Sequence, residues 1–155
     1  MGKEYDPAMH TAEHMLNQTM VRMFDCGRCV SAHVEKKKSR IDYRFSRDLT
    51  SAEIAEIERR MNELIAADLR VTEDFLPRAE ASKQFNLGKV PDDAGDPLRI
   101  IRIGDYDSCP CIGAHVKSTK EIGGFRIVST SYNDGILRLR FKVAADQSDC
   151  FTRPT

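Results

Sequence analysis

The sequence predicts a single α+β domain, in which helices pack against a sheet of antiparallel or mixed strands. Segments with helical spacing of apolar residues are mixed with short alternating segments, and its 155 residues suit one hydrophobic core. Near the end, Asn133-Asp134-Gly135 separates two alternating segments, as in a β-hairpin. We expect one domain over residues 1–155, with a core from about 7 to 143 and a C-terminal tail over 144–155.

Helices are predicted at three places. Asp6-Pro7 is a favourable helix start, and apolar residues then recur at helical spacing up to Phe24. Thr50 and Glu53 have the spacing of a capping box, which predicts a second helix reaching about Asp68. Pro77 is expected to begin a short third helix.

Strands are predicted where apolar residues alternate or form short buried runs between turn residues. Lys36-Lys37-Lys38 would form the tip of the first hairpin, and the stretch from Gly88 to Pro97 would be a loop. The expected strands are Cys29 to Val34, Arg40 to Phe45, Leu69 to Phe75, Leu98 to Ile103, Phe125 to Tyr132 and Ile136 to Val143.

Composition limits the classes of partner and the compartment. The 24 basic and 24 acidic side chains cancel, so attraction to RNA would have to come from local clusters of charge. The sequence has no apolar run long enough to span a membrane and no apolar secretory signal at its start, so we expect a cytoplasmic protein without a membrane partner. Five cysteines are an odd number, which favours reduced thiols that are available to a metal ion.

Two matched pairs of residues predict a metal site. His10 and His14 are four residues apart on the first helix, and Cys111 and His115 have the same spacing near the other end of the chain. Three of the four histidines thus fall in two pairs, and a thiolate with three imidazoles suits tetrahedral Zn²⁺. The fourth histidine, His33, is expected to be a packed or surface residue of a strand.

Other interpretations of these residues stay open. Cys109 is a rival ligand to Cys111, and Cys26 with Cys29 could form a second metal or redox pair, although ordinary thiols are favoured. His10 to His14 also satisfies the His-x-x-Glu-His pattern of inverted zinc peptidases, with Glu13 as general base. That mechanism needs a carboxylate as third ligand and an open coordination position, so the Cys/His pair argues against it.

Three motifs in this order resemble those of a known family. They are His10-Thr11-Ala12-Glu13-His14, then Cys111-Ile112-Gly113-Ala114-His115-Val116, then Thr119-Lys120-Glu121-Ile122-Gly123-Gly124-Phe125. From about His10 to Val143 the chain resembles the editing domain of alanyl-tRNA synthetase and, more closely, the free-standing short AlaX-type trans-editing proteins. Threonyl-tRNA synthetase has a similar second additional domain.

The resemblance implies an aminoacyl-tRNA deacylase that acts in trans for translation fidelity. It implies Zn²⁺ held by His10, His14, Cys111 and His115, and hydrolysis of the ester in mischarged Ser-tRNA(Ala). The expected partner is the acceptor end of an aminoacylated tRNA, not DNA. The alternatives are editing of Ser-tRNA(Thr) and a non-catalytic, zinc-stabilised tRNA-binding module.

The sequence also offers candidates for substrate recognition, acid/base catalysis and phosphate contacts. Ser31 matches the stretch where relatives often place a hydroxyl that reads the substrate, and Glu13 is a candidate acid/base or a partner of the metal ligands. The Gln and Gly-Ser pattern common in synthetase-embedded editing domains is replaced here by the segment Glu35 to Ser39. The candidate phosphate contacts are Lys36, Lys37, Lys38, Arg40, Arg138, Arg140 and Lys142.

Overall fold

The computed structural model describes residues 6–85, 87–88, 90 and 94–144. Within these residues no helix is both long and apolar enough to cross a membrane. The helices and strands, in chain order, are α1 (Pro7–Phe24), β1 (Ser31–His33), β2 (Ser39–Arg44), α2 (Ser51–Ala66), β3 (Val71–Leu76), α3 (Arg78–Gln84), β4 (Leu98–Ile103), β5 (Asp107–Pro110), the 3₁₀ turn η2 (Thr119–Ile122), β6 (Phe125–Asn133) and β7 (Ile136–Val143).

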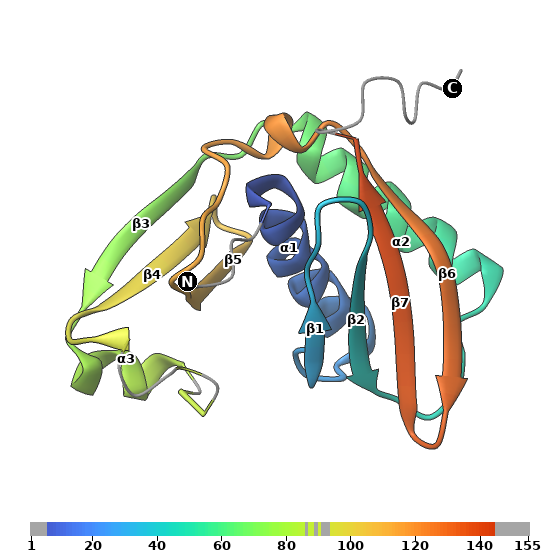
Figure 1. Ribbon diagram of the computed structural model, residues 1–155, viewed down its shortest axis with the longest axis horizontal. Helices are drawn as coiled ribbons and strands as arrows, with labels where there is room; N and C mark the ends of the chain where they lie inside the picture. The colour runs from blue at the N-terminus through green and yellow to red at the C-terminus, as the bar shows by residue number, and fades with distance from the viewer. Residues whose placement is uncertain (1–5, 86, 89, 91–93, 145–155) are drawn as a thin grey trace.

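The strands form two separate antiparallel sheets, which confirms the α+β class. One sheet has four strands in the order β1-β2-β7-β6, and the other has three in the order β3-β4-β5. Helix α1 lies between the two sheets, and α2 packs beside it behind the larger one (Figure 1). The first helix is therefore the element that both sheets can approach.

The main core lies between α1, α2 and one face of the four-stranded sheet. On β7 the buried side chains alternate with basic ones, so every second residue enters the core and the others line the opposite face. On β2, Ile41 and Tyr43 are fully buried in the same core. The opposite face of this sheet is where most of the predicted phosphate contacts lie.

The three-stranded sheet uses its two faces differently. Leu98 and Ile100 pack with Ala81 of α3 in a small second cluster. Ile103, on the other face, belongs to the main core. That second face is therefore the one directed toward α1, and the functional site is built against it.

Most predicted elements are present, with shifted ends. The capping box that begins α2 is confirmed: the backbone nitrogen of Glu53 donates to Thr50 Oγ1 over 3.1 Å, and Thr50 nitrogen donates to Glu53 Oε1 over 2.9 Å. The first strand is shorter than expected because the nitrogen of Cys29 donates to the Asn17 side chain of α1 instead of joining a strand. Neither β5 nor η2 was predicted, since neither shows clear alternation. Residues 145–155 of the expected tail, and part of the expected loop before Pro97, lie outside the described residues.

Candidate metal centre

Four residues from the two ends of the chain meet beside α1. His10, His14, Cys111 and His115 each offer one ligand atom, and these atoms all lie within 4.8 Å of one another. The two histidines on α1 are one helical turn apart, so they share a face. The other two residues come directly after β5. This strand pairs with β4 and contacts α1. The cluster is thus the product of one helix and one hairpin.

Hydrogen bonds orient two of the imidazoles. A backbone carbonyl can only accept, so His10 Nδ1 donates to the oxygen of Ala114 over 3.1 Å, and Nε2 is directed toward Cys111 Sγ at 3.4 Å. His115 Nδ1 lies 2.9 Å from Thr11 Oγ1. Its Nε2 is buried and has no hydrogen-bond partner among the described residues. Both rings therefore present Nε2 to the centre of the cluster, as a metal would require.

Asp107 is the acidic partner of His14, at ion-pair distance rather than in a hydrogen bond. Its Oδ2 lies 3.7 Å from His14 Nδ1, and the side chain is fully buried. Arg28 donates to Asp107 over 2.7 Å and 3.3 Å, and Gln18 donates over 3.0 Å. Burial alone would raise the pKa of Asp107, but the nearby His14 and the hydrogen bonds from Arg28 lower it to about 2. A carboxylate anchored in this way fixes the ring of a histidine ligand.

Two of the four ligands have the protonation state that binds a metal ion. Although burial opposes it, the three surrounding imidazoles lower the pKa of Cys111 to about 3, so the sulfur is a thiolate. Burial, together with the positive charge of His14, lowers the pKa of His115 to about 4 and keeps that ring neutral. Burial would lower the pKa of His14, but the nearby Asp107 and Cys111 raise it well above its usual value, so this ring releases its proton when an ion binds. A thiolate and a neutral imidazole are the forms that bind Zn²⁺. The donor set and the unpartnered Nε2 of His115 therefore fit the ion that the sequence predicts.

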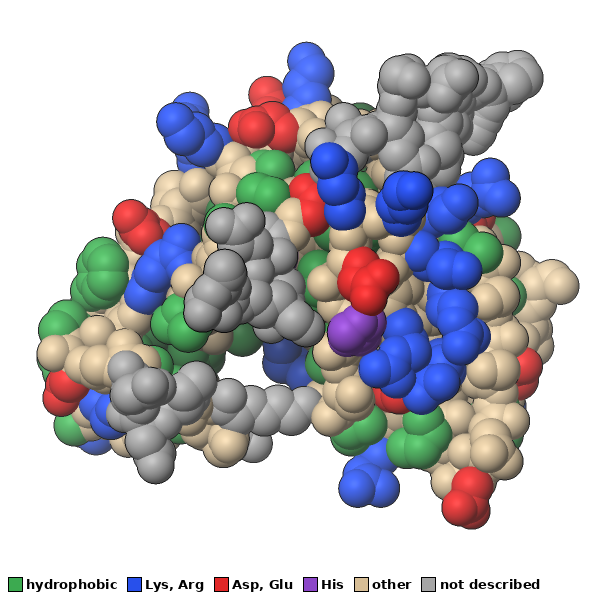
Figure 2. All heavy atoms as spheres, viewed as in Figure 1, with side chains coloured by type: hydrophobic (Ala, Val, Ile, Leu, Met, Phe, Trp, Pro, Cys, Tyr) green, Lys and Arg blue, Asp and Glu red, His purple; other side chains and the backbone are tan. Residues whose placement is uncertain are grey.

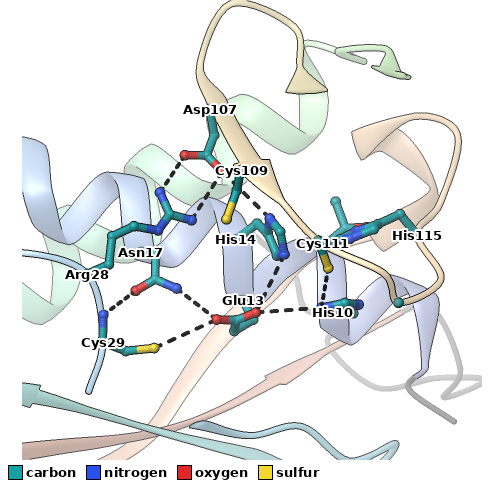
Figure 3. A network of polar contacts seen from close by, with 12 residues as sticks. His10, Glu13, His14, Asn17, Arg28, Cys29, Asp107, Cys109, Cys111 and His115 are labelled. Carbon is teal, nitrogen blue, oxygen red and sulfur yellow. Dashed lines mark hydrogen bonds and ion pairs between the residues drawn. The ribbon is translucent and has the colours of Figure 1, made fainter. Parts of the chain in front are cut away.

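Glu13 lies at the edge of this cluster. Its side chain is only 12% exposed, whereas a glutamate on a helix is more commonly solvated, and its Oε1 is 3.9 Å from Nε2 of both His10 and His14. Its other oxygen, Oε2, accepts a hydrogen bond from Asn17 Nδ2 over 2.7 Å (Figure 3). The carboxylate is therefore held with one oxygen directed toward the metal ligands.

The orientation of Asn17 follows from its partners. Its Oδ1 accepts from the backbone nitrogen of Cys29 over 2.8 Å and from the Tyr43 hydroxyl over 3.1 Å. Because a backbone N–H can only donate, the amide nitrogen must face Glu13. Asn17, Asp107 and Arg28 were not singled out from the sequence. For Asn17 a signal existed, since it lies seven residues after His10 on the same helical face.

The remaining cysteines do not join the cluster. Cys29 Sγ is 3.9 Å from Glu13 Oε2, and Cys26 Sγ is 3.8 Å from the carbonyl of Met20. Burial raises the pKa of Cys109, which keeps its sulfur in the poorer-binding thiol form. In the described part of the chain, His10, His14, Cys111 and His115 form the single group of three or more side chains that could bind a metal ion together. Cys150 lies outside the described residues.

Ser31 and His33 lie on the outer face of the large sheet. Ser31 pairs with Asp42, and His33 pairs with Arg40. Residues directly opposite each other share a sheet face, so both side chains lie on the basic face rather than on the side of Tyr43. His33 is exposed and bonds to Glu35, in agreement with its expected place as a strand residue. The structure does not bring Ser31 together with the four clustered residues.

The predicted cationic residues gather on that same face. Figure 2 shows Lys and Arg side chains collected over the four-stranded sheet. Arg138 and Arg40 both donate hydrogen bonds to Asp42. Arg138 donates two, of 2.9 Å and 3.0 Å, and Arg40 donates one of 3.4 Å. Arg140 is directly opposite Arg40, and Lys142 follows on the same strand. Lys36, Lys37 and Lys38 are in the connection between β1 and β2, as expected.

Fold and cluster together define an α+β domain with a centre that could bind a metal ion. Over residues 98–140 the sequence matches the family described as "Threonyl and Alanyl tRNA synthetase second additional domain". The chain is therefore related to the alanyl-tRNA synthetase editing domain, which confirms the resemblance inferred from its motifs.

Individual relatives agree with this assignment. The chain is 35% identical over 123 residues to the alanine–tRNA ligase of Bacillus subtilis, a match that covers 79% of this chain and 14% of the ligase. It is 34% identical over 152 residues to that of Aeropyrum pernix, covering 93% and 16%. For Treponema denticola the values are 34% over 145 residues, covering 88% and 23%. The chain thus spans less than a quarter of the length of these relatives, and its relation to them supports a tRNA-related editing or binding role.

Proposed function

We propose that the protein is an aminoacyl-tRNA deacylase that hydrolyses the ester of mischarged tRNA, with Ser-tRNA(Ala) as its main substrate. The observation that carries the proposal is the position of the Glu13 carboxylate, 3.9 Å from the Nε2 atoms of two clustered histidines. A domain related to a synthetase, with a metal-binding cluster and an adjacent carboxylate, has the groups that ester hydrolysis needs. We place its action in the cytoplasm, in translation fidelity.

In this proposal His10, His14, Cys111 and His115 hold Zn²⁺. When bound, the ion supplies a Lewis acid that polarises or orients an oxygen of the substrate or of water. Glu13 Oε1 accepts the proton of the attacking water, and a proton is later delivered to the ribose oxygen that leaves with the tRNA. Asn17 keeps Oε1 in place by binding the other oxygen of the carboxylate.

Selection of serine over alanine requires a group that recognises the serine hydroxyl. A site that hydrogen-bonds such a hydroxyl rejects an analogue without it by as much as roughly 10⁴-fold. Ser31 remains our prediction for this group, although its register with Asp42 puts it on the outer face of the sheet. The amino acid and the tRNA are therefore the parts of the proposal that experiment must decide first.

Contacts with the tRNA backbone are assigned to the outer face of the four-stranded sheet. Residues two apart on a strand are roughly 7 Å apart, which is comparable with the spacing of phosphates along a nucleic-acid strand. Arg140 and Lys142 have this spacing, and no ion pair with an acidic side chain engages them among the described residues. Together with the three lysines of the first hairpin, they are the phosphate contacts that we favour.

A second candidate function is a non-catalytic tRNA-binding module. Four protein ligands fill the tetrahedral preference of Zn²⁺, and closed sites of that kind are typical of structural zinc. In that case the ion would hold α1 against the β4–β5 hairpin. The peptidase interpretation is not favoured, because Cys111 and His115 occupy the positions that a carboxylate ligand and a water would need.

Deacylation assays separate these functions. The zinc-loaded protein is incubated with Ser-tRNA(Ala), Ala-tRNA(Ala) and Ser-tRNA(Thr), in parallel with Cys111→Ala and Glu13→Gln, and bound zinc is determined for each. Selective hydrolysis of one seryl substrate, lost with the metal in Cys111→Ala and lost without loss of metal in Glu13→Gln, supports the deacylase. Binding of tRNA without hydrolysis of any substrate would support the module instead.

A further inference from the structure

The face of the three-stranded sheet that meets α1 continues beyond the metal centre. Phe75 is paired with Arg99, Glu73 with Ile101, and Ile101 with Cys109. Directly opposite residues share a face, so Phe75, Arg99 and Cys109 lie on one side of the sheet. Asp107, two residues before Cys109, contacts α1 from that side, whereas Leu98 and Ile100 face α3. Phe75 therefore lies on the same face as the metal centre.

The register also fixes how far Phe75 lies from the centre. The nitrogen of Cys111 donates to the oxygen of Arg99 over 3.1 Å, so Cys111 continues the pairing beyond β5. Phe75, Arg99 and Cys111 are thus aligned across neighbouring strands. Two strand spacings amount to about 10 Å. This separation is comparable with the length of a nucleoside.

The surface next to Phe75 is exposed, and the charges beside it are matched. Phe75 is 54% exposed, a large fraction for an aromatic side chain. Between Phe75 and Cys111, Arg99 Nε donates to Glu73 over 2.6 Å, and its Nη1 donates to the carbonyls of Cys111 and Gly113. The charge of Arg99 is therefore matched, and the residue braces the metal-binding loop. A strip of this kind suits a flat, uncharged ligand better than a phosphate.

We propose that Phe75 is the stacking platform for the base of the 3′-terminal adenosine of the aminoacyl-tRNA. The inference rests on the proposed function, because the ester must lie at the metal centre for the base to reach Phe75. Single-stranded ends of RNA are recognised by stacking of unpaired bases on aromatic rings. Phe75 thus contributes affinity, while the metal centre and Glu13 carry the chemistry.

The test measures binding separately from hydrolysis. A minihelix with the alanine acceptor stem is prepared with serine in a non-hydrolysable amide linkage at its 3′ end, and its Kd is measured for the zinc-loaded wild type and for Phe75→Ala. We expect Kd to rise on the order of tenfold in Phe75→Ala, and to recover in Phe75→Trp. Tyr132→Ala is the matched control, since Tyr132 is another exposed aromatic, at the end of β6 in the other sheet, and its Kd should equal that of the wild type.

A second substrate assigns the effect to the base. With a minihelix whose terminal ribose lacks its base, the wild type should bind as weakly as Phe75→Ala, and the mutation should have no further effect. An equal loss in Phe75→Ala with both minihelices would overturn the inference, as would an unchanged Kd. A change in oligomeric state on sedimentation, without a change in Kd, would instead identify the strip as a contact between copies of the chain. Failure of the wild type to hydrolyse Ser-tRNA would refute the deacylase alone, because Kd is measured independently of turnover.

Discussion

Asn17 donates a hydrogen bond to Oε2 of Glu13 over 2.7 Å, and the other oxygen of that carboxylate is left 3.9 Å from Nε2 of His10 and of His14. The amide is itself fixed by the backbone of Cys29 and the hydroxyl of Tyr43. Asn17 is therefore a positioning residue, which acts on the reaction through Glu13.

The first prediction concerns this bond. Asn17→Asp replaces the donating amide with a second carboxylate, which repels Glu13 and releases its orientation. We expect kcat for deacylation to fall by about 10- to 100-fold with little change in KM, because a misdirected base affects the transition state rather than binding. Asn133→Asp, at the exposed end of β6, makes the same chemical change and should leave kcat unaltered. Loss of zinc from Asn17→Asp would instead indicate a role in metal binding.

The second prediction concerns removal of the metal. Because the ligands come from α1 and from the loop after β5, an ion bound there stabilises only the folded chain. At an ion concentration of about 100 times Kd this linkage amounts to about 2.7 kcal/mol, and we expect chelation to lower Tm by roughly 5–10 °C. Cys111→Ala should show the low Tm with or without zinc. Cys109→Ala should respond to chelation like the wild type, and a loss of zinc in that variant would make Cys109 the ligand.

The third prediction concerns Asp107, which orients His14 without being a ligand. Asp107→Asn removes the negative charge that both His14 and Arg28 face. Changes to such outer partners commonly weaken metal affinity by about 10- to 100-fold, and we expect a zinc Kd higher by that factor. Competition with a chromophoric chelator measures it. Asp105→Asn, on the exposed turn between β4 and β5, is the control, and an unchanged zinc Kd in Asp107→Asn would remove Asp107 from the site.

The fourth prediction distinguishes the arginines of the basic face. Arg140→Gln and Lys142→Gln should each weaken tRNA binding. Each should also reduce the slope of log Kd against log salt concentration by about 1, the value expected for the loss of one phosphate contact. Arg138→Gln should reduce it less, because Arg138 is already bonded twice to Asp42. Kd measured across a series of salt concentrations gives the slopes. Equal slopes for all three variants and the wild type would exclude this face as the RNA contact.

The fifth prediction concerns pH. Hydrogen bonds from Arg47 and from the backbone of Thr50 lower the pKa of Glu53 to about 2 in the folded protein, below its usual value near 4.5. A carboxyl group whose pKa is lower in the folded protein than in the unfolded chain stabilises the fold. This stabilisation is complete at a pH above the pKa of the unfolded chain and is lost as the pH falls toward 2. In urea unfolding, Glu53→Gln should therefore be less stable than the wild type at pH 7, and the difference should shrink at pH 3. A difference that does not vary with pH would show that the charge of Glu53 is not involved.

Local patterns in the sequence determined the features that depend on near neighbours. The spacing of His10 and His14 put both imidazoles on one helical face, and the Thr50 capping box fixed the start of α2. Alternation predicted β7 with its ends, because side chains on a strand face opposite sides, and a short buried-looking run predicted β4. Cys111 and His115 could be paired with the first two ligands because zinc favours a particular set of donors.

Contacts between distant segments could be decided only by the tertiary structure. Arg28 and Asp107 are 79 residues apart, and nothing in the spacing of either indicates that they share an ion pair behind His14. Packing between surfaces likewise determines that Glu13 is largely shielded from solvent, that Asp42 neutralises the charge of Arg138, and that Phe75 is exposed. A residue's local neighbours set its conformation and its chemical type. Its burial, its charge partner and the direction of its reactive atoms are set by packing, which joins segments that the sequence keeps apart.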